Sequence, residues 1–584
     1  MFLINEKNVD PLSILVITFS NAAAKELQER FHNISTLSYP VSFGTFHSIF
    51  YQILKSGNSS PLKILNQDKK YIFLKTILLE YKQTSFEELI ISDDIISKLL
   101  SQFSLLKNTI SLFRYEEIPQ ISEKAFYFLF QKYQHLLKDE EMIDFDDMLY
   151  QCKQLLQKSP SLTRYFQNKY HYILVDEFQD INPIQYELIR LLAFPQNNLF
   201  VVGDDDQSIY GFRGSTPQLM QQFMKDYQNC TKLLLTTNYR SSASIINFSQ
   251  KVICENKNRL EKGMISGQPE GVGYNTQNEV IVKGFLSKEE EYAYIISTLK
   301  VGFNVQNTTA CIFRTNMEAT LLAELLTKEK ICFTKKIRIQ NPYKDFIFRD
   351  FIHYLNLAAT EDEKMLCSDF AAVMNRPKRY LKRSILTQNT VSFDELHESY
   401  KDKNYMHSIL EKFRHDLSFI KNMDLFCAVN YIRKAIGYDN FLMQYAMDEK
   451  KESIQQLLER ADMIQSRMKY FNTIEELNTH AKQFETECES ALCCGDNTKE
   501  SRIVLLTYHV SKGLEFDRVF LPDCNEGTIP SHRCNNNEQI EEERRMFYVG
   551  MTRAKEELQL LYVKGDKSKK YIPSRFLPKK HDGI

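Results

Sequence analysis

The sequence predicts an α/β protein built on parallel sheets. Five short apolar runs end in a polar or glycine-rich loop: SILVITFS (13–20), YILVDEFQD (172–180), LFVVGDDDQS (199–208), ACIFRTN (310–316) and RIVLLTYHVSKG (502–513). Runs of this length and flanking are typical of strands that are buried on both faces, and helical patterns follow most of them. Because strand and helix alternate, we expect parallel sheets with helices on their faces.

Two long stretches between the strands have a different pattern. From about 50 to 140 and from about 346 to 495, leucine, lysine, tyrosine and phenylalanine recur at helical spacing, which indicates helical insertions. We therefore expect two α/β lobes, each interrupted by a helical subdomain. The expected boundaries are 1–50 and 141–240 for the first lobe, 51–140 for its insertion, 241–345 and 496–584 for the second lobe, and 346–495 for its insertion.

Composition favours a soluble globular protein, with 43% hydrophobic and 26% charged residues and a net charge of -1. This balance excludes bulk attraction to nucleic acid, so a polyanion would have to bind a local groove of positive residues. No apolar run approaches the roughly 18 residues of a membrane span, and no basic leader precedes one, so we expect a cytoplasmic protein. The twelve cysteines match no usual zinc spacing and are expected to be reduced thiols.

The first candidate site follows the run YILV. Asp176 and Glu177 come directly after it, and α/β sheets place their ligands at the carboxyl ends of strands. One acid can hold Mg²⁺, while the next orients and deprotonates a water that attacks a γ-phosphate. A lone pair of acids would more simply be a solvated strand-end turn. The second loop, GDDDQSIYGFRGS, makes the functional interpretation stronger.

That second loop places Gln207 beside Tyr210, Phe212 and Arg213. A neutral glutamine suits the detection of a γ-phosphate or its attacking water, while the aromatic rings and the arginine can stack on or pair with a nucleic-acid strand. One loop would then contact both ligands and couple them.

Two further segments carry arginines suited to phosphate chemistry. In NYRS (238–241), Tyr239 can stack on a base and Arg240 can neutralise a developing phosphate charge, although the same residues could simply cap the following helix. Near the other end, Arg553 follows the apolar segment MFYVGM. It is a candidate arginine finger, a residue class worth roughly 10³ to 10⁵ in rate.

These blocks, in this order, resemble the motifs of the UvrD/Rep family, the superfamily 1 DNA helicases that move 3' to 5'. The resemblance extends from about residue 13 to 577 and implies two RecA-like lobes of the P-loop NTPase type. The matching blocks are ILVITFSNAAAKELQERF (14–31), GTFHS (44–48), IDFDDML (143–149), VDEFQD (175–180), VVGDDDQSIYGFRG (201–214), NYRS, IFRTN (312–316), TYHVSKGLEF (507–516) and YVGMTRAK (548–555).

The resemblance also implies residue roles. Asp176 would bind Mg²⁺ and Glu177 would be the catalytic base, with ATP as the nucleotide. The protein would also contact ATP through Gln207, Arg240 and Arg553 at the γ-phosphate, Tyr239 at adenine and Glu515 at the ribose. Positions near single-stranded DNA would be Thr18, Asn21, Thr45, His47, Tyr210, Phe212, Arg213 and His509. Many relatives have tryptophan where Phe212 stands, and this chain has no tryptophan.

One family element is missing from the sequence. A helicase of this family needs the phosphate loop (Walker A) G-x-x-x-x-G-K-[ST], which cradles the phosphates and reaches them with its lysine. None of the eighteen glycines is followed by lysine. We expect that the recorded start omits the loop or that the gene is broken; a genuine ATPase-dead paralogue is the alternative. In each case residues 1–584 should bind ATP poorly and hydrolyse it negligibly.

The resulting prediction is an ATP-dependent 3' to 5' DNA helicase or single-strand translocase, acting in DNA repair or replication. Its partners would be single-stranded DNA and duplex junctions, bound without sequence preference. The alternative is a non-catalytic single-stranded DNA-binding or scaffolding protein that keeps the helicase shape.

Overall fold

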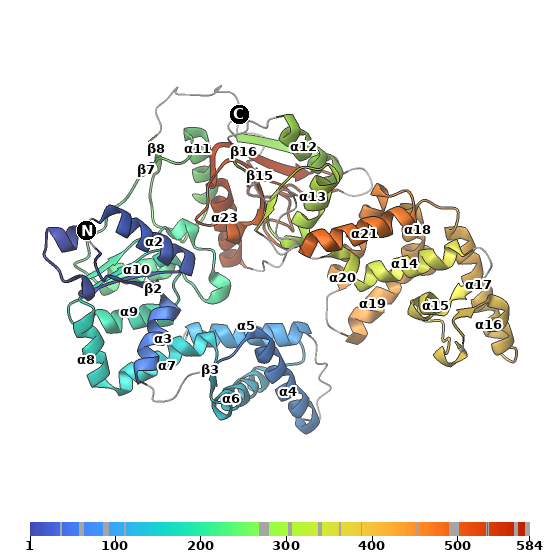
Figure 1. Cartoon of the computed structure of the whole chain (residues 1–584), viewed down its shortest axis with the longest axis horizontal. Helices are drawn as coiled ribbons and strands as arrows, with labels where there is room; N and C mark the ends of the chain where they lie inside the picture. The colour runs from blue at the N-terminus through green and yellow to red at the C-terminus, as the bar shows by residue number, and fades with distance from the viewer. Residues whose placement is uncertain are drawn as a thin grey trace. The chain divides into compact units, whose positions relative to one another are not determined.

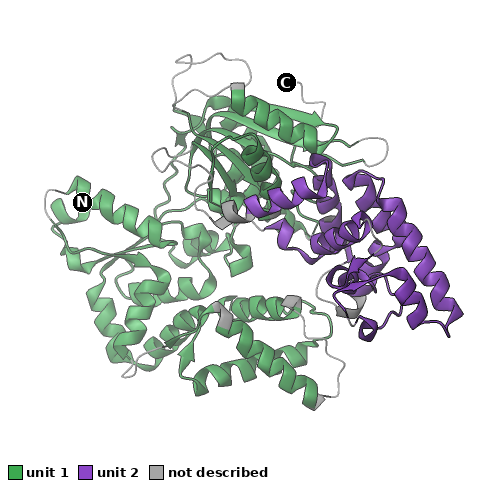
Figure 2. Ribbon diagram, turned by 45° about the vertical axis from the view of Figure 1, so that its right-hand side comes forward, with its two compact units in different colours: residues 1–91, 95–337, 500–584 green, residues 92–94, 338–499 purple. Residues whose placement is uncertain are grey.

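The computed structural model divides the chain into two compact units (Figure 2): Met1–Ile91, Ile95–Ile337 and Glu500–Ile584 form unit 1, and Ser92–Asp94 and Arg338–Lys499 form unit 2. The residues described are 1–35, 38–57, 63–85, 93–109, 113–267, 280–301, 307–336, 341–360, 364–386, 388–449, 454–489, 502–532, 534, 536–565 and 570–578.

Unit 1 contains two parallel sheets, which confirms the predicted fold class (Figure 1). The first sheet has the order β2-β1-β5-β6, formed by Ser42–Thr45, Ile14–Thr18, Tyr172–Val175 and Leu199–Val201. Its central strands pair in register from Ile14 opposite Tyr172 to Ile17 opposite Val175. The adjacent strands therefore deliver their following loops to the same edge of the sheet.

The second sheet has the order β11-β14-β10-β15-β16-β9. Its strands are β9 (Val280–Phe285), β10 (Thr309–Phe313), β11 (Thr334–Lys335), β14 (Ile503–Thr507), β15 (Phe516–Leu521) and β16 (Ala554–Val563). All five residues of β10 are buried, as expected for a central parallel strand with helices on both faces. A further parallel pair, β7 (Thr237–Asn238) with β8 (Ile265–Ser266), lies in the chain segment between the two sheets.

Helices follow most strands of unit 1. In the part of the chain around the first sheet they are α1 (Phe2–Asn5), α2 (Asn21–Ile34), α3 (Phe46–Gly57), α7 (Phe145–Lys158), α8 (Pro160–Lys169), α9 (Pro183–Ala193) and α10 (Gln218–Asp226). Around the second sheet they are α11 (Ala243–Ile253), α12 (Lys288–Val301), α13 (Asn316–Lys328), α22 (Tyr508–Ser511) and α23 (Asn537–Met551).

A helical subdomain interrupts the first set of elements. It consists of α4 (Gln67–Ser85), α5 (Asp93–Thr109) and α6 (Glu123–Asp139), with the short parallel pair β3 (Lys63–Ile64) and β4 (Met142–Ile143) at its base. It has its own core, in which Phe103 and Phe126 are buried. Lys107 of α5 forms an ion pair with Asp144, 2.8 Å away at the start of α7.

Unit 2 is almost entirely helical around a separate core that includes Phe351, Tyr354 and Phe413. Its helices are α14 (Phe346–Ala359), α15 (Cys367–Val373), α16 (Phe393–Ser399), α17 (Asn404–Ile420), α18 (Leu425–Tyr431), the π-helix Ile432–Ile436, α19 (Tyr438–Glu449), α20 (Ile454–Arg467) and α21 (Ile474–Glu489). One antiparallel pair, β12 (Met365–Leu366) with β13 (Thr390–Val391), joins them.

The structure bears on two expectations about the whole chain, one about membrane spans and one about its cysteines. No helix among the described residues is long and apolar enough to cross a membrane. The expectation of reduced thiols is wrong at Cys332, which is disulfide-bonded, because sequence spacing does not reveal which thiols come within bonding distance. Eight other described cysteines are free.

Candidate functional site

The predicted acids lie where two neighbouring strands end. Val202 N donates to Val175 O at 2.9 Å, and Phe178 N donates to Val202 O at 2.9 Å, so the loops after β5 and β6 leave the sheet together. Gly203 makes this possible, because a Cβ there would lie 2.6 Å from Gln179 Oε1. That same Oε1 accepts a hydrogen bond from Asp204 N at 3.0 Å.

Asp176 and Glu177 form an electrostatically strained pair. Burial and the neighbouring Glu177 charge raise the pKa of Asp176. Glu177 accepts a hydrogen bond from Gln179 Nε2, and Lys512 Nζ lies 3.7 Å from its Oε2. A divalent cation bound by Asp176 would relieve the repulsion between the two carboxylates, so this residue pair fits Mg²⁺.

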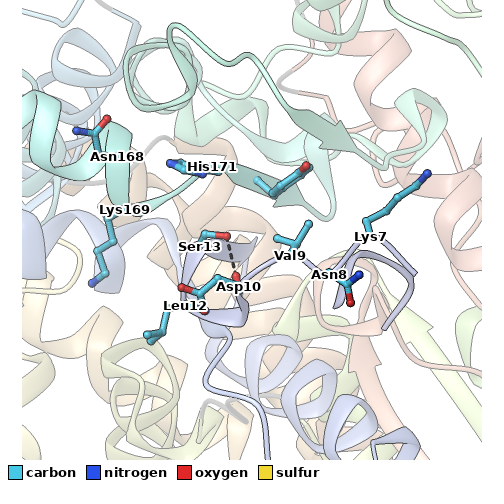
Figure 3. Close-up of a pocket in the computed structure, with 10 residues that line it drawn as sticks. Lys7, Asn8, Val9, Asp10, Leu12, Ser13, Asn168, Lys169 and His171 are labelled. Atoms are coloured by element: carbon cyan, nitrogen blue, oxygen red, sulfur yellow. Dashed lines mark hydrogen bonds between the residues drawn. The ribbon is translucent and has the colours of Figure 1, made fainter. Parts of the chain in front are cut away.

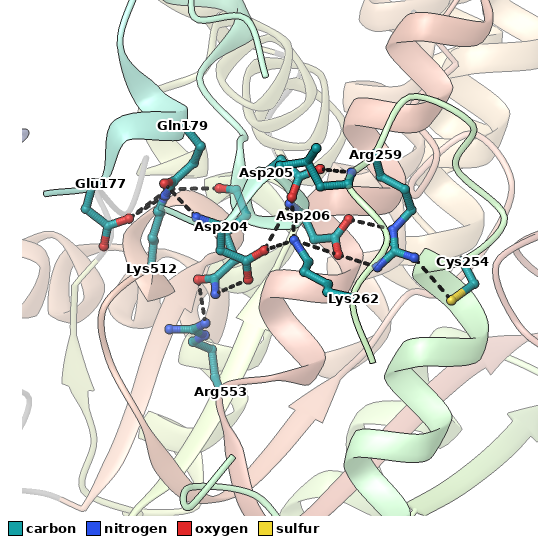
Figure 4. A network of polar contacts seen from close by, with 12 residues as sticks. Glu177, Gln179, Asp204, Asp205, Asp206, Cys254, Arg259, Lys262, Lys512 and Arg553 are labelled. Carbon is teal, nitrogen blue, oxygen red and sulfur yellow. Dashed lines mark hydrogen bonds and ion pairs between the residues drawn. The ribbon is translucent and has the colours of Figure 1, made fainter. Parts of the chain in front are cut away.

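Arg553 reaches the loop after β6 from the other sheet (Figure 4). Its side chain is 1% exposed, and its Nη2 lies 3.3 Å from Gln207 Oε1. Burial and the nearby positive charge of Arg240 lower the pKa of Arg553 to about 10, with Glu177 opposing the shift. Arg553 therefore contacts Gln207 and lies within electrostatic reach of Arg240 and Glu177; the catalytic roles expected of these four residues stay predictions.

Arg240 and Glu515 contact each other. Arg240 Nε donates to Glu515 Oε2 at 2.9 Å, and Lys555 Nζ lies 2.6 Å from Glu515 Oε1. The two cations hold the pKa of Glu515 below its usual range, Lys555 having the larger effect. Tyr239 is 75% exposed, with its ring packed against the backbone of Gly267. This exposure leaves the ring accessible to a planar ligand.

Three acids of the loop after β6 converge on cations instead of solvent. Asp204, Asp205 and Asp206 are the group of carboxylates among the described residues that could together hold a metal ion. Lys262 Nζ contacts all three, and Arg259 forms a bidentate pair with Asp206 at 3.0 and 2.7 Å. These basic side chains neutralise the acids (Figure 4).

An aromatic cluster surrounds Tyr210. Its ring stacks on Phe19 with a centroid distance of 4.7 Å and lies 6.0 Å from Phe212. His509 meets Phe212 edge-on at 5.5 Å, and the Arg213 guanidinium lies 5.6 Å from the Phe212 ring. Burial lowers the pKa of His509 to about 4. At neutral pH this histidine is therefore an uncharged ring.

Three of the four remaining predicted DNA positions line a pocket of about 380 Å³: Asn21, Thr45 and His47, together with Phe19 and Phe145. Phe145 is 51% exposed and its ring lies 5.8 Å from that of His47. Burial lowers the pKa of His47.

Thr18 differs from these, because it is only 1% exposed and does not line this pocket. Its predicted contact with DNA stays a prediction.

A larger pocket, of about 430 Å³, lies elsewhere (Figure 3). It is lined by Ser13 and Tyr172, at the amino ends of β1 and β5, and by Lys7, Lys169 and His171. Because the acids follow the carboxyl ends of the strands, this pocket is separate from the candidate site.

Comparison with known protein families shows which family the chain belongs to. Residues 1–228 match the UvrD/REP helicase N-terminal domain, and residues 233–565 match the UvrD-like helicase C-terminal domain. The chain belongs to the UvrD/REP helicase family. Together the two matched segments include every candidate site residue named above.

Several relatives resemble this UvrD/REP family member over almost its whole length. The putative ATP-dependent DNA helicase YjcD of Bacillus subtilis is 30% identical, covering 98% of this chain and 76% of the relative. DNA helicase II of Rickettsia typhi is 29% identical over 98% of this chain and 89% of its own length. The ATP-dependent DNA helicase PcrA of Staphylococcus aureus is 29% identical over 99% and 81%.

Sequence reasoning missed several residues that contact the candidate site of this UvrD/REP family member. Lys512 contacts Asp180 Oδ2 and donates to Gln207 O at 2.8 Å, so it bridges both strand-end loops. Phe19 lay between two predicted DNA positions and was passed over. Lys262 and Arg259 gave no signal, because nothing local marks a basic residue as the partner of acids about 55 positions away.

Proposed function

We propose that this chain is an ATP-dependent DNA helicase of the UvrD/PcrA type that translocates 3' to 5' on single-stranded DNA, in DNA repair or replication. One observation carries the proposal. The loop after β6 presents Gln207 to Arg553 at 3.3 Å and, three to six residues later, presents Tyr210 and Arg213 to the aromatic cluster. A nucleotide and a DNA strand would thus contact the same short loop.

Within the proposed reaction each residue has a physical task. Glu177 is the base for the attacking water, and the guanidinium groups of Arg553 and Arg240 stabilise charge on the transferring phosphate. Mg²⁺ held by Asp176 would neutralise phosphate charge. Tyr239 supplies an exposed face for adenine, and Gln207 reports the presence of the γ-phosphate to the loop.

DNA binding in this proposal depends on stacking and phosphate contacts. Stacking on rings such as Tyr210 and Phe212 is worth about 1 to 3 kcal/mol per base and tolerates any sequence. Arg213 would add phosphate attraction that weakens as salt rises. With a net charge of -1, the chain has no general attraction for DNA, so binding would be confined to this surface and to duplex junctions beside it.

We further propose that residues 1–584 on their own bind ATP poorly. No glycine of the sequence is followed by lysine, so the loop that normally cradles the phosphates has no counterpart among them. The base, the arginines and the stacking tyrosine would then surround a triphosphate that lacks most of its ligands.

The test uses purified residues 1–584 in two assays. Fluorescence anisotropy with a labelled oligothymidylate and a mixed-sequence strand should give similar, salt-sensitive dissociation constants, whereas blunt duplex should bind more weakly. A coupled assay should detect negligible ATP turnover with or without DNA. Robust DNA-stimulated turnover would contradict the proposed ATPase defect and support the helicase. Release of streptavidin from one biotinylated DNA end would then establish the direction of translocation.

The alternative candidate is a non-catalytic single-strand-binding protein. The same missing Gly-Lys pair favours it. The alternative predicts tight single-strand binding that 5 mM MgATP leaves unchanged, in the native protein from its own cells as well as in residues 1–584. Nucleotide-dependent binding by the native protein would exclude it.

A further inference from the structure

The loop that carries the aromatic side chains packs against the elements around the second sheet of unit 1. This aromatic loop, residues 203–213, starts at the end of β6 in the first sheet. Its Ile209 is nevertheless fully buried in a core formed by residues of the second half, among them Tyr508 and Phe547. The loop therefore follows a strand of the first sheet along the chain, but its Ile209 side chain packs in the core beside the second sheet.

Two side chains of α23 hold the backbone of the aromatic loop. Arg545 Nε donates to Ser208 O at 3.0 Å, and Glu542 Oε1 accepts from Gly211 N at 2.9 Å. Arg545 is 7% exposed. The two bonds lie on either side of the buried Ile209, so the loop is held at Ser208, Ile209 and Gly211.

A side chain at position 211 would displace the Glu542 carboxylate. A Cβ there would lie 2.5 Å from Glu542 Oε2 and 2.8 Å from its Cδ. The backbone of Gly211 is outside the left-handed region, so alanine would meet no conformational strain there and only the carboxylate would oppose it. This makes Gly211→Ala a specific way to displace the Glu542 carboxylate from the loop.

We propose that Glu542 and Arg545 are positioning residues of the DNA-binding surface. They tie Tyr210, Phe212 and Arg213 to α23, and Arg553 follows two residues after that helix ends at Met551. The aromatic side chains and the arginine at the nucleotide site then move as one body. This inference rests on the proposed DNA binding, but its first readout below does not require DNA.

The chain offers a clean reporter because it contains no tryptophan. Phe212→Trp places a single indole on the aromatic loop, and its fluorescence anisotropy and acrylamide quenching report loop mobility. In this parent, Glu542→Leu should lower the anisotropy, increase quenching and weaken binding to a labelled oligothymidylate about tenfold. Glu542→Gln should behave like the parent, since its amide oxygen still accepts from Gly211 N.

Two controls separate positioning from general damage. Glu538→Gln removes a charge from the exposed first turn of the same helix and should change nothing. Gly211→Ala breaks the contact from the opposite side and replaces Glu542→Leu if that variant does not fold, as judged by circular dichroism. Because both changes break one contact, the double variant should be no worse than the more severe single variant.

The inference is overturned if Glu542→Leu and Gly211→Ala, both folded, match the parent in anisotropy, quenching and affinity. Loss of affinity in Glu542→Gln as severe as in Glu542→Leu would also overturn it, because the hydrogen-bond acceptor is still present. If the parent itself does not bind the oligonucleotide, the proposed function fails. The DNA-free anisotropy then still supports or overturns the anchoring on its own.

Discussion

The Arg553 guanidinium lies 3.3 Å from the side-chain oxygen of Gln207, although the two residues are 346 positions apart in sequence. Gln207 in turn donates from Nε2 to Asp204 Oδ2 at 2.8 Å. The orientation of the amide is thus set from both ends, with its oxygen towards the arginine. This contact and those of Lys512 with Asp180 and Gln207 O link the two sheets at the candidate nucleotide site.

Replacing Arg553 by methionine should destabilise the second half of unit 1. The guanidinium also donates to Val549 O at 2.9 Å and to Leu514 O at 3.2 Å, and both carbonyls would lose a buried partner. We expect a loss of about 2 to 4 kcal/mol, seen as a lower urea midpoint. Arg30→Met, at a surface ion pair on α2, should leave the midpoint unchanged. An equal shift of the urea midpoint in both variants would contradict the stabilising role of the Arg553 hydrogen bonds.

Arg213 and His509 should affect DNA binding in different ways. Arg213→Gln should reduce the slope of log affinity against log salt by about 0.7, the value for one phosphate contact on a single strand. His509→Gln should weaken binding at every salt concentration without changing the slope, because a pKa of about 4 leaves the ring neutral at pH 7. A slope change in the histidine variant would show that it carries charge in the complex.

The same histidine should make the protein sensitive to mild acid. Its pKa is lowered to about 4 in the fold from about 6.5 in the unfolded chain, so the native state binds fewer protons between these values. Stability should therefore fall as pH drops from 6.5 to 4, by up to about 3 kcal/mol from this group. Thermal melts across this range should show a smaller drop for His509→Gln; identical pH profiles would refute the shift.

Lys262 should be replaceable in part by a divalent cation. Lys262→Met leaves Asp204, Asp205 and Asp206 with converging carboxylates, of which Asp206 keeps its ion pair with Arg259, so the melting temperature should fall by several degrees. Millimolar Ca²⁺ should restore part of that loss while leaving the wild type unchanged. Lys555→Met, which removes one of the two cations that contact the single acid Glu515, is the matched control and should show no rescue.

The sequence predicted the fold well where the signal was local. The five apolar runs contain β1, β5, β6, β10 and β14. It did not single out β16, because AKEELQLLYV begins with charged residues before its buried half. Nor did it single out β9 as a strand, although VIVKGF is a short apolar segment at the edge of the second sheet.

Site prediction had a similar limit. The acids, Gln207 and the aromatic residues could be named because their chemistry is concentrated in short loops at strand ends. Pairings such as Arg553 with Gln207, 346 positions apart, or Lys512 with Asp180, 332 apart, arise only when the second sheet comes to the first. No pattern within one segment encodes them.

The burial of Ile209 has a consequence for how the polypeptide can be divided. A fragment that begins after residue 240 retains all six strands of the second sheet, yet it would have an isoleucine-sized hole among Tyr508, Phe547 and their neighbours. During synthesis Ile209 leaves the ribosome about 300 residues before Tyr508 and Phe547, so it cannot reach its buried place until those residues have been made.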